Sequence, residues 1–113
     1  MKRAEIHSLR LPFCLVLVAA IADGRMPAHG ETSSLAETGA AVYALRCSGC
    51  HGVELHNTSG GQVFDLRRLR PEEHDRFVDS VTSGKDNMPS WYGILTAAEI
   101  DAIWAYIRAT VGE

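Results

Sequence analysis

The chain has 113 residues, enough for one domain, and its formal net charge is −3. An acidic balance argues against binding to nucleic acid, because such binding depends on basic residues that neutralise phosphates. It suits a protein that meets its partners through complementary surface charge. A domain this small buries a limited core, so we expect a covalent or metal-based supplement to its stability.

The N-terminal segment has the pattern of a secretory signal peptide. Three basic residues (Lys2, Arg3 and Arg10) precede an apolar run over residues 11–22. As a helix this run would reach only about 18 Å, whereas the hydrocarbon core of a membrane is about 30 Å thick. Cleavage fits best after Ala20-Ile21-Ala22, and Ala28-His29-Gly30 is a second candidate site.

We therefore expect residues 1–22 to be a cleaved signal peptide, residues 23–34 a flexible leader and residues 35–113 the folded domain. The alternative is an uncleaved anchor or a buried N-terminal helix, but no later segment needs so hydrophobic a partner. Cys14 does not fit a lipid attachment site, because Phe13 before it is too bulky. The expected product is an exported, periplasmic protein with no stable membrane insertion.

Three helices are expected in the domain. The first covers residues 35–46, with Leu35, Gly39, Val42 and Tyr43 on one face. Glycine in a helix costs about 1 kcal/mol relative to alanine, so Gly39 indicates a close packing contact with another helix.

The other two helices follow long loops. Pro71 opens the second, its buried stripe is Phe77, Val78 and Val81, and Gly84 ends it. Thr96 and Glu99 form a capping box for the last helix. The buried stripe of that helix consists of Ile100, Ile103, Trp104 and Ile107. No convincing pair of strands appears, so the expected fold class is all-α.

The segment Cys47-Ser48-Gly49-Cys50-His51 carries the chemistry. Two cysteines at this spacing can form thioether bonds to the two vinyl groups of one haem, and the adjacent histidine can supply the proximal imidazole to iron. Cys-x-x-Cys-His is the attachment signature of c-type haem. The sequence therefore predicts one covalent haem c held by Cys47 and Cys50, with His51 as an axial ligand.

Three other uses of paired cysteines stay open at this point. A thioredoxin-like dithiol would follow a strand in a βαβ unit, and a zinc site would need a second pair of ligands. A structural disulfide would suit an exported chain. The haem interpretation is favoured because the export signal and the helical pattern agree with it.

Met88-Pro89 supplies a candidate for the second axial ligand. A thioether is a soft ligand, and a Met/His pair raises the potential of a haem. Pro89 stiffens the loop that would present the sulfur. Methionines more often fill a core, but apart from Met26 in the leader, Met88 is the only methionine expected in the mature chain.

Three histidines compete with Met88 for this position: His29, His56 and His74. His74 stands beside charged residues at the start of a helix, where a solvated surface role is favoured. His56 is only five residues from His51 and is poorly placed to reach the opposite face of a haem.

On these residues the chain resembles the class I cytochrome c family over residues 35–112. The resemblance implies a small all-α domain whose first and last helices cross near Gly39 and the Trp104–Ile107 turn.

A narrower resemblance lies in Gly60-Gly61-Gln62-Val63-Phe64-Asp65-Leu66-Arg67, which is similar to a stretch in cytochromes associated with pyrroloquinoline-quinone alcohol dehydrogenases. In many such relatives a proline precedes the aspartate, and its carbonyl accepts the ring N–H of the proximal histidine. Here Phe64 stands in that place, and its carbonyl is the candidate acceptor. The resemblance also makes Arg67 a candidate for contact with a haem propionate, the alternative being a solvated arginine.

The function expected from these features is transfer of single electrons without substrate chemistry. The donor would be a dehydrogenase, with a quinoprotein alcohol dehydrogenase as a candidate, and the acceptor a downstream cytochrome or an oxidase. A haem enzyme or gas-binding protein with an open sixth iron site is the rival. A third class is a structural protein with a disulfide and no haem.

Overall fold

The computed structural model describes residues 29–112, so the expected signal peptide and the first part of the leader lie outside the described residues. Four helices occur in this part: α1 (His29–Arg46), α2 (Ser48–His51), α3 (His74–Ser83) and α4 (Ala97–Val111). Three short 3-10 turns connect them: η1 (Val53–Leu55), η2 (Leu66–Arg68) and η3 (Pro71–Glu73). Within residues 29–112 there is no strand, only an isolated bridge between Lys85 and Met88. The all-α expectation is confirmed.

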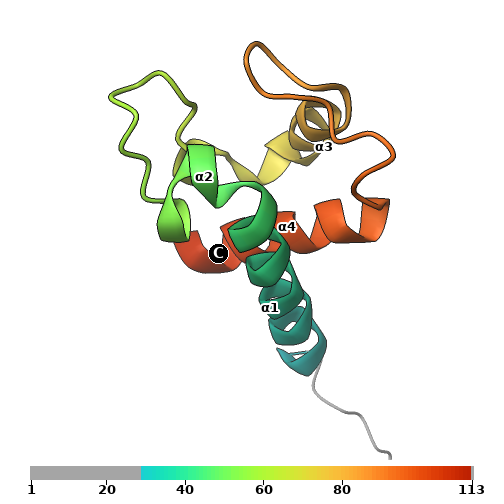
Figure 1. Cartoon of the computed structure of the whole chain (residues 1–113). Coiled ribbons are helices and arrows are strands. Elements are labelled where there is room, and N and C mark those ends of the chain that lie inside the picture. Colours follow the sequence, from blue (N-terminus) through green and yellow to red (C-terminus); the bar gives the residue numbers. More distant parts are fainter. Residues whose placement is uncertain (1–28, 113) are drawn as a thin grey trace, which may run out of the picture.

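Helices α1 and α4 cross at Gly39 (Figure 1). A Cβ atom on Gly39 would overlap the carbonyl group of Ala102, so only glycine allows the two backbones to approach this closely. One turn further along α1, the Tyr43 ring lies 5.2 Å from that of Tyr106, centroid to centroid. The expected close contact of Gly39 is confirmed, but its partner is Ala102, before the Trp104–Ile107 turn.

The first helix differs from its expected extent in two ways. It begins at His29, so residues 29–34, expected to belong to a flexible leader, are helical. Glu31 in the first turn stabilises this end through the helix dipole. Leu35, expected on the buried face, is 43% exposed. It precedes the crossing at Gly39 by one turn, on the part of α1 that projects from the other helices (Figure 1).

The other two helices have the ends that the sequence predicts. Pro71 opens the 3-10 turn η3, which continues directly into α3, and Gly84 ends α3 with a positive φ of 79°. In the capping box of α4 the Glu99 backbone N–H donates to the Thr96 hydroxyl, and the Thr96 N–H donates to the Glu99 carboxylate.

A single core joins α1, α3, α4 and the loops between them. Within the described residues its buried hydrophobic members are Tyr43, Leu55, Leu69, Phe77, Val81, Leu95, Ile100, Ala102, Ile103 and Ile107. Helix α2 and the loop after α3 lie on the same side of α4 (Figure 1). The core thus supports the two segments that carry His51 and Met88.

Within residues 29–112, no helix combines the length and the apolar character needed to cross a membrane.

Candidate haem site

The Cys47–His51 segment continues from α1 almost without a break. The Cys47 N–H donates to the Tyr43 carbonyl at 2.9 Å, and the His51 N–H donates to the Cys47 carbonyl at 2.9 Å. The segment thus forms one compact helical turn that places Cys47, Cys50 and His51 close together. Cys47 is half-buried and Cys50 is exposed, and the two do not form a disulfide with each other.

Tyr43 fixes the far end of this turn. Its side chain is 1% exposed, and its hydroxyl donates to the Gly52 carbonyl at 2.7 Å. Burial is the main reason that the pKa of Tyr43 is raised to about 12, so the hydroxyl keeps its proton at neutral pH. Gly52 itself has a φ of 89°, and a Cβ there would overlap the His56 carbonyl. A glycine is therefore needed directly after His51.

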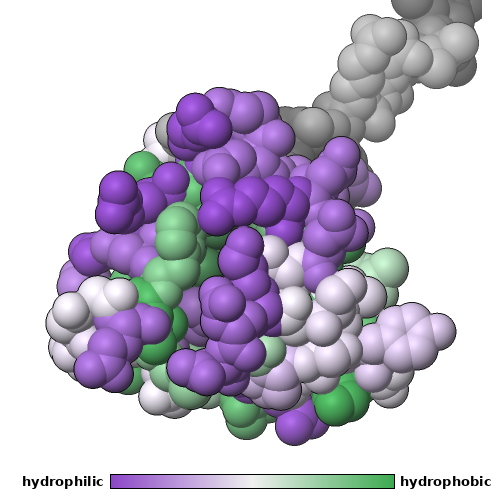
Figure 2. Space-filling model, turned by 90° about the horizontal axis from the view of Figure 1, so that it is seen from above, coloured by the Kyte–Doolittle hydropathy of each residue, from purple (hydrophilic) through white to green (hydrophobic). Residues whose placement is uncertain are grey.

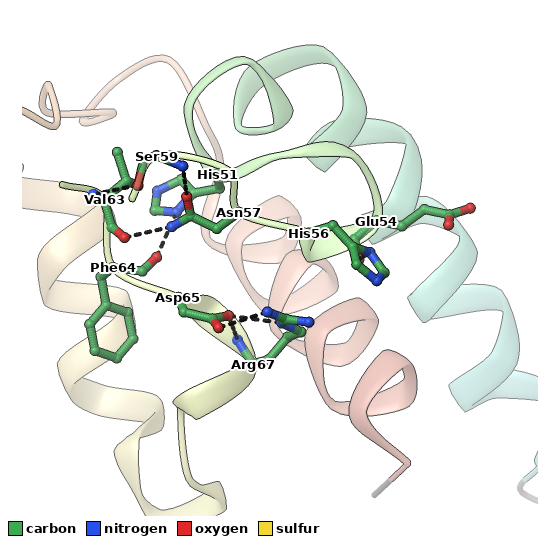
Figure 3. Close-up of polar contacts among 9 residues, drawn as sticks. All are labelled: His51, Glu54, His56, Asn57, Ser59, Val63, Phe64, Asp65 and Arg67. Atoms are coloured by element: carbon green, nitrogen blue, oxygen red, sulfur yellow. Dashed lines mark hydrogen bonds and ion pairs between the residues drawn. The ribbon is translucent and has the colours of Figure 1, made fainter. Parts of the chain in front are cut away.

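The imidazole of His51 is oriented by the backbone. Its Nδ1 lies 3.2 Å from the Phe64 carbonyl oxygen (Figure 3). A carbonyl can only accept a hydrogen bond, so Nδ1 carries the proton and Nε2 is left with a lone pair. Burial lowers the pKa of His51, against a smaller opposite effect of the Phe64 bond, and this favours the neutral imidazole that binds a metal. Phe64 therefore supplies the contact that the sequence left open.

Side chains hold the chain on both sides of Phe64 (Figure 3). Before it, the Asn57 amide donates to the Val63 carbonyl, and the Val63 N–H donates to the Ser59 hydroxyl at 2.9 Å. After it, the Asp65 carboxylate caps η2 by accepting the Arg67 N–H at 3.0 Å. The turn-forming residues were visible in the sequence, but not their role in placing the acceptor of the His51 proton.

Met88 lies in a tight turn after α3. The Met88 N–H donates to the Lys85 carbonyl at 2.9 Å, and the Lys85 N–H donates to the Met88 carbonyl at 3.1 Å. The Ser90 hydroxyl donates to the Thr82 carbonyl at 2.6 Å, which ties the turn to the end of α3. The Met88 side chain is half-buried. Hydrogen bonds thus fix the loop that carries Met88, and its role as an axial ligand stays a prediction.

The competing histidines have other contacts. His56 Nδ1 lies 3.0 Å from the Glu54 carbonyl oxygen within the same short turn. His74 Nε2 lies 3.0 Å from Asp101 Oδ1, and the His74 ring meets the Trp104 ring edge-on at 5.3 Å. His74 therefore joins α3 to α4, while its side chain stays 39% exposed at the surface, as the sequence suggested. His29 opens α1.

Arg67 forms a two-pronged ion pair with Asp65, Nε to Oδ1 at 3.0 Å and Nη2 to Oδ2 at 2.9 Å (Figure 3). Its side chain is exposed, and this pairing is the main cause of the lowered pKa of the Asp65 carboxyl. Contact of Arg67 with a haem propionate stays a prediction.

Two of the other uses of the cysteines, a reactive dithiol and a zinc site, fit the structure poorly. Burial, followed by the charge of Cys50, raises the pKa of the Cys47 thiol to about 11, whereas a reactive dithiol needs a lowered thiol pKa. Among residues 29–112 no group of three or more His, Cys, Asp or Glu side chains could hold a metal ion. A covalent haem c needs two thiols and one imidazole from this chain, and Cys47, Cys50 and His51 lie together in one helical turn.

The surface on the side of α2 and of the loop after α3 is partly hydrophobic. Figure 2 looks down on the face from which α2 and the loop after α3 project, and hydrophobic residues form a band between hydrophilic ones there. The large hydrophobic side chains exposed in the described residues are Leu35, Leu45, Val53, Phe64, Tyr92 and Ile94.

Helices packed around a Cys-x-x-Cys-His turn, with an imidazole whose Nε2 is left for iron, define a c-type cytochrome domain. Residues 34–107 match the family described as "Cytochrome C oxidase, cbb3-type, subunit III". The chain belongs to the cytochrome c family, and it binds haem c covalently. Its general function is electron transfer.

The chain is similar to proteins of two kinds. It is 39% identical over 83 residues to the quinohemoprotein alcohol dehydrogenase ADH-IIG of Pseudomonas putida, a match that covers 72% of this chain and 11% of that enzyme. A solved structure of ADHIIG from Pseudomonas putida HK5 superposes with a TM-score of 0.60 and 37% identity, over 70% of this chain and 12% of that one. The chain therefore spans only a small part of the enzyme.

The second kind has the size of a single domain. Cytochrome c6 of Euglena gracilis is 33% identical over 81 residues, which are 66% of this chain and 91% of the cytochrome. Cytochrome c6 of Microcystis aeruginosa is 27% identical over 63% of this chain and 91% of that protein.

Proposed function

We propose that this chain is an exported, periplasmic carrier of single electrons that catalyses no reaction of its own. Cys47 and Cys50 hold the haem through thioether bonds, and His51 and Met88 are the axial ligands of its iron. The haem supplies an iron that takes up and releases one electron. Two fixed protein ligands leave no open position for a substrate, which separates a carrier from an oxygen-binding or peroxide-using protein.

The observation that carries this proposal is the hydrogen bond from His51 Nδ1 to the Phe64 carbonyl at 3.2 Å. It selects the tautomer whose Nε2 can bind iron and restricts rotation of the ring. Because the ligand is held before and after each electron moves, little structural change accompanies the change in iron charge.

The turn around Met88 supports the second ligand in the same way. Its backbone is closed by two hydrogen bonds to Lys85, and a Cβ at Gly84 would lie 2.9 Å from the Met88 carbonyl oxygen. A preformed loop loses little entropy when its sulfur binds, which favours a methionine bond that persists in both oxidation states.

The similarity to ADH-IIG supports a quinoprotein alcohol dehydrogenase as the electron donor. The match to nearly the full length of cytochrome c6 supports a carrier role for a domain of this size. We propose a downstream cytochrome or an oxidase as the acceptor. Contacts with both partners would be small and transient, as in other redox encounters.

Replacing Met88 tests the proposed ligand set. Met88→Leu keeps the side-chain volume and removes only the sulfur, so the loop should stay folded. We expect the reduction potential to fall by on the order of 0.1 V or more, within the roughly 0.8 V over which axial ligands set haem potentials. Met88→Ala should do the same and should bind carbon monoxide rapidly when reduced. Redox titration followed by absorbance measures both effects.

A variant whose potential and oxidised spectrum match those of the unmodified protein would show that Met88 is not the ligand. Lys85→Ala is the control, because it changes a neighbour in the same turn while its backbone bonds to Met88 remain. Its spectrum should keep the features of a methionine-bound haem.

A further inference from the structure

The position of the Phe64 carbonyl decides how His51 is held, yet proline does not fix the backbone at this residue. The side chains of Asn57 and Ser59 hydrogen-bond to Val63, before Phe64, and the side chain of Asp65 hydrogen-bonds to Arg67, after Phe64. Phe64 also has a side chain that is 44% exposed, so burial alone fixes its ring weakly. Its ring points away from His51, while its carbonyl faces the imidazole (Figure 3).

A cation lies over that ring. The guanidinium carbon of Arg76 is 5.4 Å from the centroid of the Phe64 ring, within the range of a cation–π contact. Arg76 belongs to α3 and lies twelve residues after Phe64 in the chain. This contact therefore joins the loop whose carbonyl accepts the His51 proton to helix α3.

Arg76 is itself fixed by the start of α3. Its Nη1 pairs with Oε1 of Glu73, whose side chain is only 14% exposed. The other carboxylate oxygen of Glu73 accepts the Arg70 backbone N–H at 2.9 Å. Glu73, with both carboxylate oxygens engaged, thus anchors the Arg76 guanidinium near Phe64, although the Arg76 side chain is 50% exposed.

We propose that Arg76 is a positioning residue for the axial histidine. Through Phe64 it holds the carbonyl that accepts the His51 Nδ1 proton, and in this way it lowers the reduction potential of the bound haem. This inference rests on the proposed function, because it takes His51 as an iron ligand.

The sign of the effect separates this role from that of a surface charge. A firm bond to the Nδ1 proton makes the imidazole a stronger donor, which stabilises ferric iron and lowers the potential. Loosening the bond should therefore raise the potential. Simple loss of a positive charge should lower the potential, because a less positive surrounding stabilises ferric iron.

The test uses the haem-loaded protein and four variants. Arg76→Ala removes the cation, Arg76→Lys keeps it, and Phe64→Leu removes the ring without changing charge. Arg68→Ala is the charge control: Arg68 lies in the same stretch of chain, and within residues 29–112 its guanidinium is not over an aromatic ring. Redox titration gives the potential, and NMR of the reduced protein gives the exchange rate of the His51 Nδ1 proton.

We expect Phe64→Leu to raise the potential. Arg76→Ala also loses a positive charge, so its potential should lie above that of Arg68→Ala, which loses the charge alone. Both Arg76→Ala and Phe64→Leu should speed exchange of the Nδ1 proton by about two- to fivefold, the range of one exposed cation–π contact. The double variant should go no further than either change alone. Arg76→Lys should lie close to the unmodified protein. Arg68→Ala should lower the potential and leave exchange unchanged.

A potential in Arg76→Ala equal to that in Arg68→Ala, with unchanged exchange of the Nδ1 proton, would overturn the inference and show that Arg76 acts only as a surface charge. Failure of this inference can be told apart from failure of the proposed function. If only the inference fails, the spectrum of the unmodified protein still shows histidine and methionine as iron ligands. If the proposed function fails, it does not.

Discussion

Replacing His51 with alanine should leave most of the protein without covalent haem. The thioether bonds form correctly only when the porphyrin is held over Cys47 and Cys50, and the imidazole next to Cys50 is the group placed to hold it. The ratio of haem absorbance to protein, together with haem staining of denatured protein, measures attachment. Denaturation leaves a thioether bond intact, so only covalent haem is counted.

His56→Ala is the matched control for this experiment. His56 is exposed, and its ring contacts only the Glu54 carbonyl among the hydrogen bonds found in residues 29–112. Attachment in this variant should equal that of the unmodified protein. Normal attachment in His51→Ala would contradict the assignment of His51 as the proximal ligand.

Adding one methyl group at Gly39 should destabilise the whole domain. In Gly39→Ala the new Cβ would overlap the Ala102 carbonyl, which is backbone and cannot rotate away. Moving α1 off α4 would cost about 1–3 kcal/mol, as overpacked cores do, and this outweighs the gain of about 1 kcal/mol in helix propensity. The midpoint of unfolding by guanidinium chloride, followed through the haem spectrum, should therefore fall.

Gly30→Ala makes the same chemical change in the same helix. Among residues 29–112, a Cβ at Gly30 has no neighbour within 4 Å, so stability should be unchanged or slightly increased. If Gly39→Ala were as stable as Gly30→Ala, the close crossing of α1 and α4 would not be a determinant of this fold.

Features with local causes were predictable from the sequence. The capping box at Thr96 and Glu99, the start at Pro71 and the stop at Gly84 each depend on residues within one turn, and the structure has all of them. The Cys47–His51 turn belongs to the same group, because the chemistry of its residues and their spacing are both local.

Features with distant causes were not. The bond between His74 and Asp101 and the position of Arg76 over Phe64 depend on residues brought together only by folding. No periodicity in the sequence relates an arginine on a helix to a phenylalanine in a separate loop. The acceptor of the His51 proton lies between these cases: its place in the sequence could be predicted, but the contacts that fix it could not.

The absorbance spectrum of the oxidised, unmodified protein tests the central claim most directly. Iron bound by His51 and Met88 predicts the weak long-wavelength band of a sulfur-to-iron charge transfer, and the reduced protein should not bind carbon monoxide rapidly at neutral pH. Absence of that band together with rapid carbon monoxide binding would contradict the account, because it would show an open sixth site and a haem built for ligand chemistry instead of electron transfer.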